Sequence, residues 1–206
     1  MTSQTSWTST RAVAARSVNA LMTATYWKIG RRIVEFEQGG GGRGAYGEAL
    51  IRRLGTDLSQ RFGRGFGWRN LAQMRTFYLV WPTEQILQTL SAISAGRPCS
   101  GTLARNAPEP GAVAQALPLP WCAYVRLLSV KTVARAFYEA EALREGWSVR
   151  QFDRQISSQL YERLALSRNK VALLRKAADV QPGDLLTPED AIRDLFVLEF
   201  LDIKDE

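Results

Sequence analysis

The segment YGEALIRRLGTDLSQRFGRGFGWRNLAQMRTFYLV, residues 46–80, decides how this chain folds. In its first half, apolar residues recur at the spacing that places them on one face of a helix, so a helix is predicted over 46–62. These residues are Leu50, Ile51, Leu54, Leu58 and Phe62. Glycines at 63, 65 and 67 end that pattern, and a second helix is predicted from Trp68 to Leu79. Two short helices around a glycine-containing turn are typical of a helix-turn-helix, so we predict one here.

Helical spacing also dominates the sequence on both sides of this segment. Before it, residues 11–37 are predicted as one helix that Thr10 caps and the glycines at 39–42 end. After it, helices are predicted around 84–90, at 121–128, 133–143, 148–164 and 167–178, and from Thr187 onward. Ser148 and Gln151 are predicted as a capping box at the start of the helix over 148–164. No run alternates between apolar and polar residues as a strand would, so we predict an all-α protein. The winged-helix variant, which adds a short hairpin, stays open at this point.

Residues 94–118 differ in character from the rest, because Gly, Pro, Ser and Ala dominate and apolar periodicity is weak. A connection of this length is unusual inside a compact domain, so we predict a loop or linker between two helical lobes. The predicted organisation is an N-terminal lobe with the helix-turn-helix over 1–93, the Gly/Pro/Ala-rich loop over 94–118, a second lobe over 119–178 and an acidic tail over 179–206.

Composition excludes several classes of protein. The chain has no histidine, which removes Ser-His-Asp and Cys-His hydrolases and the commonest metal ligand. Its two cysteines, Cys99 and Cys122, lack the spacing of a zinc site or a disulfide framework. Metal sites made of carboxylates alone stay open, but no acids pair as a catalytic acid and base, so we expect no catalytic site, metal or cofactor here. The sequence contains neither a signal peptide nor an apolar run of about 18 residues, so we expect a cytoplasmic protein.

Charge is distributed unevenly along the chain. The net charge is +7, yet residues 179–206 hold nine acids against two bases, so residues 1–178 carry +14. Seven arginines lie between Arg43 and Arg75, with Glu48 and Asp57 as the acids among them. Arginine suits bidentate contact with phosphates and base edges, and such a field attracts polyanions. Nucleic acid is therefore the first partner to consider, against the alternative of a merely basic surface.

Within the helix-turn-helix, outward residues near the start of the second helix are of the types that read bases. They are Arg69, Asn70, Gln73 and Arg75. Contacts with phosphates are expected from Arg52, Arg53, Arg61 and Arg64. A weaker second set is Arg150 and Arg154, four residues apart and so on one helix face. Trp147 beside this set is interpreted as a core residue rather than a stacking platform. The alternative for the whole segment is an ordinary helical hairpin with a solvated basic face.

Four stretches resemble the N-terminal domain of the YhcG-type family of PD-(D/E)xK nucleases. They are ARSVNALMTATYWKIGRRIVEFEQ (15–38), RGAYGEALIRRLGTDL (43–58), GRGFGWRNLAQMRTFY (63–78) and RAFYEAEALREGWSVRQFDRQISSQLYERLALSRNK (135–170). In that family a helical, winged-helix-like and DNA-binding region precedes the nuclease domain. The resemblance implies that TPEDAIRDLFVLEFLDIKDE (187–206) corresponds to the junction with that domain, whose catalytic acids and lysine would lie beyond Glu206.

The chain departs from the family pattern in two places. After Trp121 it reads Cys122-Ala123-Tyr124, where the family has a serine-histidine-tyrosine step. The segment 94–116 matches no pattern of the family. No local site is therefore carried over to either place.

From charge, motif and resemblance together, we expect a nucleic-acid-binding module for duplex DNA that serves as the targeting part of a nuclease system. A rival class is a protein-interaction or oligomerisation module, in which the helices form a homo-oligomer or dock a separate nuclease subunit. A third class is an enzyme in its own right, for which the sequence offers no positive sign.

Overall fold

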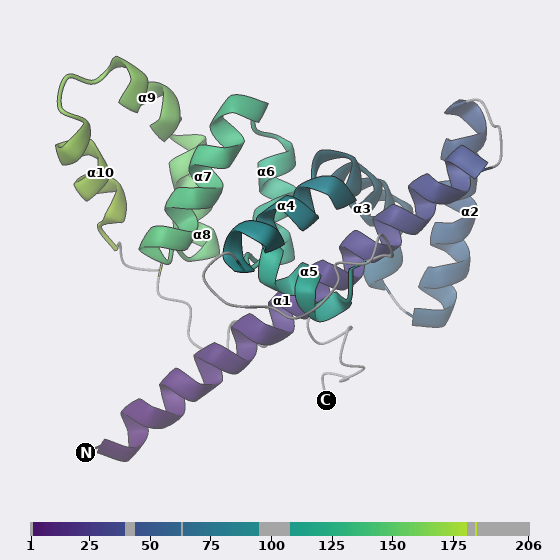
Figure 1. Cartoon of the computed structure of the whole chain (residues 1–206), viewed down its shortest axis with the longest axis horizontal. Helices are drawn as coiled ribbons and strands as arrows, with labels where there is room; N and C mark the ends of the chain where they lie inside the picture. Colours follow the sequence, from purple (N-terminus) through teal and green to yellow (C-terminus); the bar gives the residue numbers. More distant parts are fainter. Residues whose placement is uncertain (1, 40–43, 63, 95–107, 181–183, 185–206) are drawn as a thin grey trace.

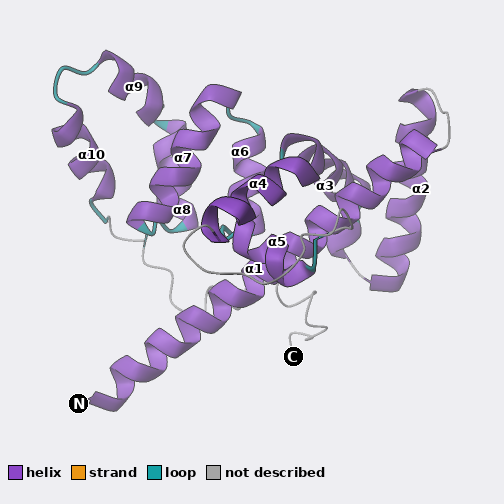
Figure 2. Cartoon of the chain, viewed as in Figure 1, coloured by secondary structure: helices purple, strands orange, loops and turns teal. Residues whose placement is uncertain are grey.

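The computed structural model describes residues 2–39, 44–62, 64–94, 108–180 and 184 (Figure 1). Within these residues every regular element is a helix and none is a strand (Figure 2). The predicted all-α class is therefore confirmed, and the hairpin of a winged helix has no counterpart in the described ranges. The predicted helix start at Thr187 and most of the predicted loop, 95–107, lie outside the described residues.

The helices follow the chain in this order: α1 (Thr2–Gly39), α2 (Gly44–Phe62), the short 3-10 helix η1 (Arg64–Phe66), α3 (Trp68–Val80), α4 (Thr83–Ser94), α5 (Pro110–Ala116), α6 (Trp121–Leu128), α7 (Thr132–Glu145), α8 (Val149–Ser157), α9 (Leu160–Leu166) and α10 (Lys170–Ala178). Most bounds agree with the predicted ranges to within a few residues. Helix α1 starts well before the predicted cap Thr10, because the polar stretch 2–10 contains no glycine or proline to stop it.

Helix α1 is the longest of the described helices, and it packs against both α3 and α5 (Figure 1). Trp27 is fully buried on α1, and its indole N–H donates to the main-chain oxygen of Trp81 at 2.6 Å. Because Trp81 caps the C-terminal end of α3, this bond fixes that end of α3 against α1. The helix that carries all four predicted base-reading residues is thus anchored to α1 at its C-terminal end.

One hydrophobic core joins the regions on either side of the predicted loop. The ring of Trp121 on α6 lies 5.1 Å from the ring of Tyr26 on α1 and 5.2 Å from that of Phe77 on α3. Tyr124, one turn further along α6, lies 5.0 Å from Phe77. Edge-to-face and tilted contacts of this kind stabilise a core beyond the area that they bury. The predicted boundary at 119 therefore does not separate two independent cores.

The loop prediction is wrong for its C-terminal part, since residues 110–116 form helix α5. Pro110 occupies the first turn, where a proline ring is preorganised for a helix. Val113, Ala116 and Leu117 are buried, so this short helix contributes to the core. A seven-residue helix of small residues gives little periodic signal, and its stability comes from packing that sequence alone does not show.

The predicted helix 148–164 is in fact two helices, α8 and α9. The chain turns at Gln159, whose φ of 52° lies in the left-handed region. The predicted cap is present, because the Ser148 hydroxyl accepts from the Gln151 N–H at 3.2 Å. Trp147 is buried against Phe152, which confirms its interpretation as a core residue.

No helix among the described residues is both long enough and apolar enough to cross a membrane. In the same ranges, no cluster of three or more histidine, cysteine, aspartate or glutamate side chains is arranged to hold a metal ion.

Candidate nucleic-acid interface

The predicted helix-turn-helix segment folds as α2, η1 and α3. A β-carbon added at Gly55 of α2 would lie 2.8 Å from the main-chain nitrogen of Trp68. The missing side chain at 55 therefore lets the start of α3 rest directly on α2. The bounds of the two helices agree with the predicted ranges, while helix-turn-helix geometry and docking of α3 into a DNA groove stay predictions.

Most of the basic side chains predicted on this segment point to solvent. The exposed basic residues are Arg52, Arg53, Arg61 and Arg69, and the uncharged Gln73 is exposed beside them. Arg52 also pairs with Glu48 across one turn of α2 at 2.8 Å. The side chain of Arg64 lies outside the described residues. Exposed arginines on two adjacent helices are the electrostatic arrangement that phosphate binding needs.

Trp68 is the residue of this surface that sequence reasoning missed. Its side chain is 41% exposed, although tryptophan is highly buried on average. The guanidinium carbons of Arg52 and Arg69 lie 4.9 Å and 5.4 Å from its ring centroid, within the range of cation–π attraction. Beside it lies a hollow of about 380 Å³ lined also by Thr56, Ser59 and Gln60. The sequence pattern that could have indicated Trp68 as a contact residue is an aromatic residue at the start of a helix, directly followed by arginine.

Two of the predicted base-reading residues make contacts within the protein instead. The Asn70 amide donates to the main-chain oxygen of Gly65, and its oxygen accepts from the Trp121 indole N–H at 3.1 Å. The Nε of Arg75 lies 3.0 Å and 2.8 Å from the two carboxylate oxygens of Glu37. Both residues therefore link α3 to its neighbours, and sequence gave no sign of these partners.

The second predicted set, Arg150 and Arg154, lies on α8, and Arg154 contacts the start of the acidic tail. Arg154 pairs with the buried carboxylate of Asp184 at 2.7 Å, and it donates to the main-chain oxygen of Asp179 at 3.4 Å. Arg150 is exposed near the start of the same helix. The structure thus does not bring Arg150 and Arg154 together with the arginines of α2 and α3. Helix α8 lies on the other side of the molecule from α2 (Figure 1).

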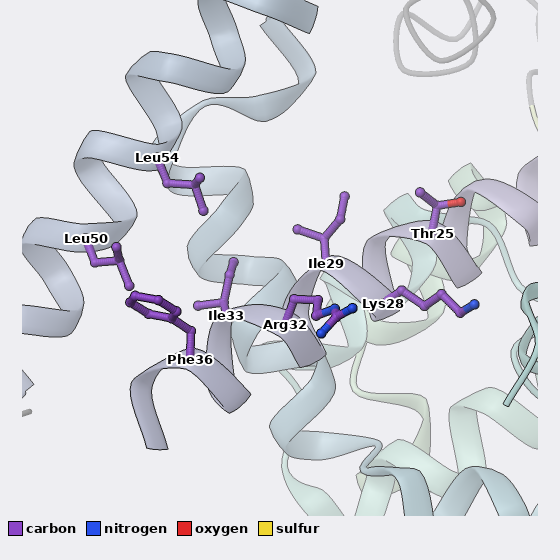
Figure 3. A pocket seen from close by; sticks show the side chains of 8 residues that line it. All are labelled: Thr25, Lys28, Ile29, Arg32, Ile33, Phe36, Leu50 and Leu54. Atoms are coloured by element: carbon purple, nitrogen blue, oxygen red, sulfur yellow. The ribbon is translucent and has the colours of Figure 1, made fainter. Parts of the chain in front are cut away.

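A second surface feature is an apolar groove of about 430 Å³ between α1 and α2 (Figure 3). Its lining residues are Thr25, Lys28, Ile29, Arg32, Ile33, Phe36, Leu50 and Leu54. Phe36 extends toward Leu50 across the groove, and it is 58% exposed. An exposed apolar groove of this size is typical of a docking surface for a ligand or partner.

These features define an all-helical module with an arginine-rich surface around an exposed tryptophan. The chain belongs to the DUF1016 N-terminal domain family, which it matches over residues 4–163. A protein of Escherichia coli (strain K12) named "Putative nuclease YhcG" is 53% identical over 205 residues. The alignment covers 96% of this chain and 54% of that protein, so the chain spans about half of its relative's length. The resemblance found in the sequence is thereby confirmed. No solved structure matches the chain.

Proposed function

We propose that this chain binds nucleic acid through the exposed surface of α2 and α3, and that it does so as part of a nuclease system without cleaving the strand itself. The observation that carries the proposal is the cluster of exposed arginines around Trp68. Guanidinium groups contact phosphates, and an accessible aromatic face contacts sugars or bases. The name of the relative supports the link to a nuclease, and the net charge of +14 on residues 1–178 supports a polyanionic partner.

Within this proposal the predicted contact residues receive three different roles. Arg52, Arg53, Arg61 and Arg69 are exposed and are assigned to phosphates, with duplex DNA as the proposed ligand. Asn70 and Arg75 are assigned to positioning α3, because their polar groups already have partners in the protein. Arg154 is assigned to holding the acidic tail.

The test is a fluorescence-anisotropy titration of labelled duplex DNA at several salt concentrations. The logarithm of the binding constant should fall linearly with the logarithm of the salt concentration. The double variant Arg53→Ala with Arg69→Ala should reduce the magnitude of this slope by roughly 1.8, or about 0.9 for each phosphate contact. A matched control is Arg168→Ala with Lys170→Ala, which removes the same charge from two exposed residues at the start of α10. No binding at low salt, or equal losses in both double variants, contradicts the proposed surface.

The apolar groove between α1 and α2 favours a second candidate function, docking of a protein partner. Its apolar lining, with Lys28 and Arg32 among the lining residues, fits an apolar segment that carries acidic side chains. Light scattering over a range of concentrations tests whether a second copy is that partner. Phe36→Ser should then abolish association, whereas Leu166→Ser, which replaces an 87% exposed residue on α9, should not. A monomer at every concentration excludes self-association through this groove.

A further inference from the structure

We infer that the hollow beside Trp68 is a binding site for an unpaired nucleobase, an inference that rests on the proposed nucleic-acid function. A fully paired duplex offers no base face to an aromatic side chain, since its bases are stacked on one another. An unpaired nucleotide, at a bulge, a strand end or a flipped position, offers that face. The inference narrows the ligand class from duplex DNA in general to nucleic acid with an unpaired base.

The first argument is how Trp68 is held. The close approach of α2 at Gly55 fixes the main chain of Trp68, while its side chain stays 41% exposed. The main chain that carries the indole is thus held between two helices, while part of the ring stays accessible. A ring on a fixed main chain loses less conformational entropy when a base stacks on it than one on a mobile segment.

The second argument is the charge around the ring. Arg52 and Arg69 approach the indole from different helices, at 4.9 Å and 5.4 Å from its centroid. Arg52 is oriented further by its pair with Glu48. A base that stacks here takes the place of one of these guanidinium groups over the ring, and the displaced group then binds a phosphate of the same nucleotide. Stacking and phosphate binding therefore act on the same nucleotide.

The third argument is the size and the lining of the hollow. Its volume of about 380 Å³ falls within the roughly 300–1,000 Å³ of small-ligand pockets. Thr56, Ser59 and Gln60 line it and carry donor and acceptor atoms for the edge of a base. The Thr56 hydroxyl donates to the Arg52 main-chain oxygen at 3.1 Å, which leaves its own oxygen as an acceptor.

The experiment uses the full chain and two otherwise identical DNA duplexes. One has a single unpaired 2-aminopurine, and in the other this base is paired; each also has a distant dye for anisotropy. We expect tighter binding of the duplex with the unpaired base by roughly 5- to 150-fold, the effect of one base–aromatic stack. The 2-aminopurine fluorescence should be quenched on binding, because the base stacks on the indole.

Variants of α3 separate stacking from general binding. Trp68→Ala should remove both the preference and the quenching, and Trp68→Phe, which keeps a smaller ring, should leave an intermediate preference. Leu79→Ala, which alters another exposed apolar residue of α3, is the matched control and should keep the preference. Binding of both duplexes without preference, or a preference that survives Trp68→Ala, overturns the inference and leaves the proposed function standing. No binding of either duplex at low salt overturns the proposed function itself.

Discussion

Gly30 of α1 lies directly against the main chain of Met74 in α3. A β-carbon added at Gly30 would lie 2.0 Å from the Met74 carbonyl oxygen and 2.6 Å from its carbonyl carbon. The two helices therefore touch backbone to backbone, without a side chain between them. This contact sets the position of α3, and with it the positions of Trp68 and Arg69 on the proposed interface.

Gly30→Ala should destabilise the protein by about 2–3 kcal/mol or more, because rigid main-chain atoms have to move apart. Urea unfolding followed by circular dichroism measures the change. Gly111→Ala is the control, since a β-carbon at this exposed position in α5 meets no atom within 4 Å. That variant should gain up to about 1 kcal/mol through helix propensity. Equal stability of the two variants would show that α1 and α3 are not in this contact in solution.

Buried Tyr124 and half-buried Glu139 form a hydrogen-bonded pair that makes stability depend on pH. The Tyr124 hydroxyl donates to Glu139 at 3.0 Å. Burial raises the pKa of Glu139, and hydrogen bonds from Tyr124 and Trp81 oppose that rise. The folded state thus binds the Glu139 proton more tightly than the unfolded state. The contribution of Glu139 to stability is full below the ordinary pKa of 4.5, and it decreases as pH rises through the raised value.

Tyr124→Phe should therefore cost more stability at pH 7 than at pH 4. The variant removes one donor from the Glu139 carboxylate, so the pKa of Glu139 should rise further. A loss of about 1.5–3 kcal/mol at pH 7 is expected for a hydrogen bond to a charged group. Urea unfolding at both pH values measures the difference, and the Glu139 carboxyl carbon signal in NMR measures its pKa. An equal loss at both pH values contradicts the assignment of this pair.

Asn70→Ala should lower stability more than nucleic-acid affinity. The substitution removes the bond to Gly65 and leaves the Trp121 indole N–H without its acceptor, at a cost of about 2 kcal/mol. Gln73→Ala, at an exposed position on the same helix, should leave the unfolding midpoint unchanged. Thermal unfolding and anisotropy on the same samples compare the two effects. A large loss of affinity with unchanged stability would instead indicate that Asn70 contacts bases.

The difference between Asn70 and Ser148 shows what sequence can and cannot predict here. The cap at Ser148 depends on residues three positions apart, so the pattern alone was enough. The Gln151 side chain, by contrast, donates to the main-chain oxygen of Ala177 instead of completing a local capping box. Asn70 likewise has a partner 51 positions away. Helix faces and caps are local properties, whereas the partners of polar side chains depend on tertiary packing.

The same reasoning explains why the site was only partly predicted. The basic character of α2 and α3 follows from composition, and the structure places most of those arginines at the surface. The exposure of Trp68 depends on the space that Gly55 leaves, which requires the packing of two helices to be known. An apolar residue at the start of a helix is more often buried, so a stacking role was not expected there.

Arg75 provides the last prediction, because its role differs from that of its neighbour Arg69. The Glu37 carboxylate that it pairs with is only 15% exposed, so removal of Arg75 leaves a largely buried charge unpaired. Arg75 itself is 37% exposed, and solvent screening limits the expected loss for Arg75→Ala to about 1–2 kcal/mol.

In salt titrations with DNA, Arg69→Ala should reduce the logarithmic slope by about 0.9, whereas Arg75→Ala should leave it unchanged. The double variant Glu37→Gln with Arg75→Gln should regain much of the stability, because neither partner then leaves an unpaired charge. A slope that falls equally for Arg69→Ala and Arg75→Ala would mean that DNA breaks the Glu37 pair. The phosphate-binding surface would then extend from α3 onto the end of α1.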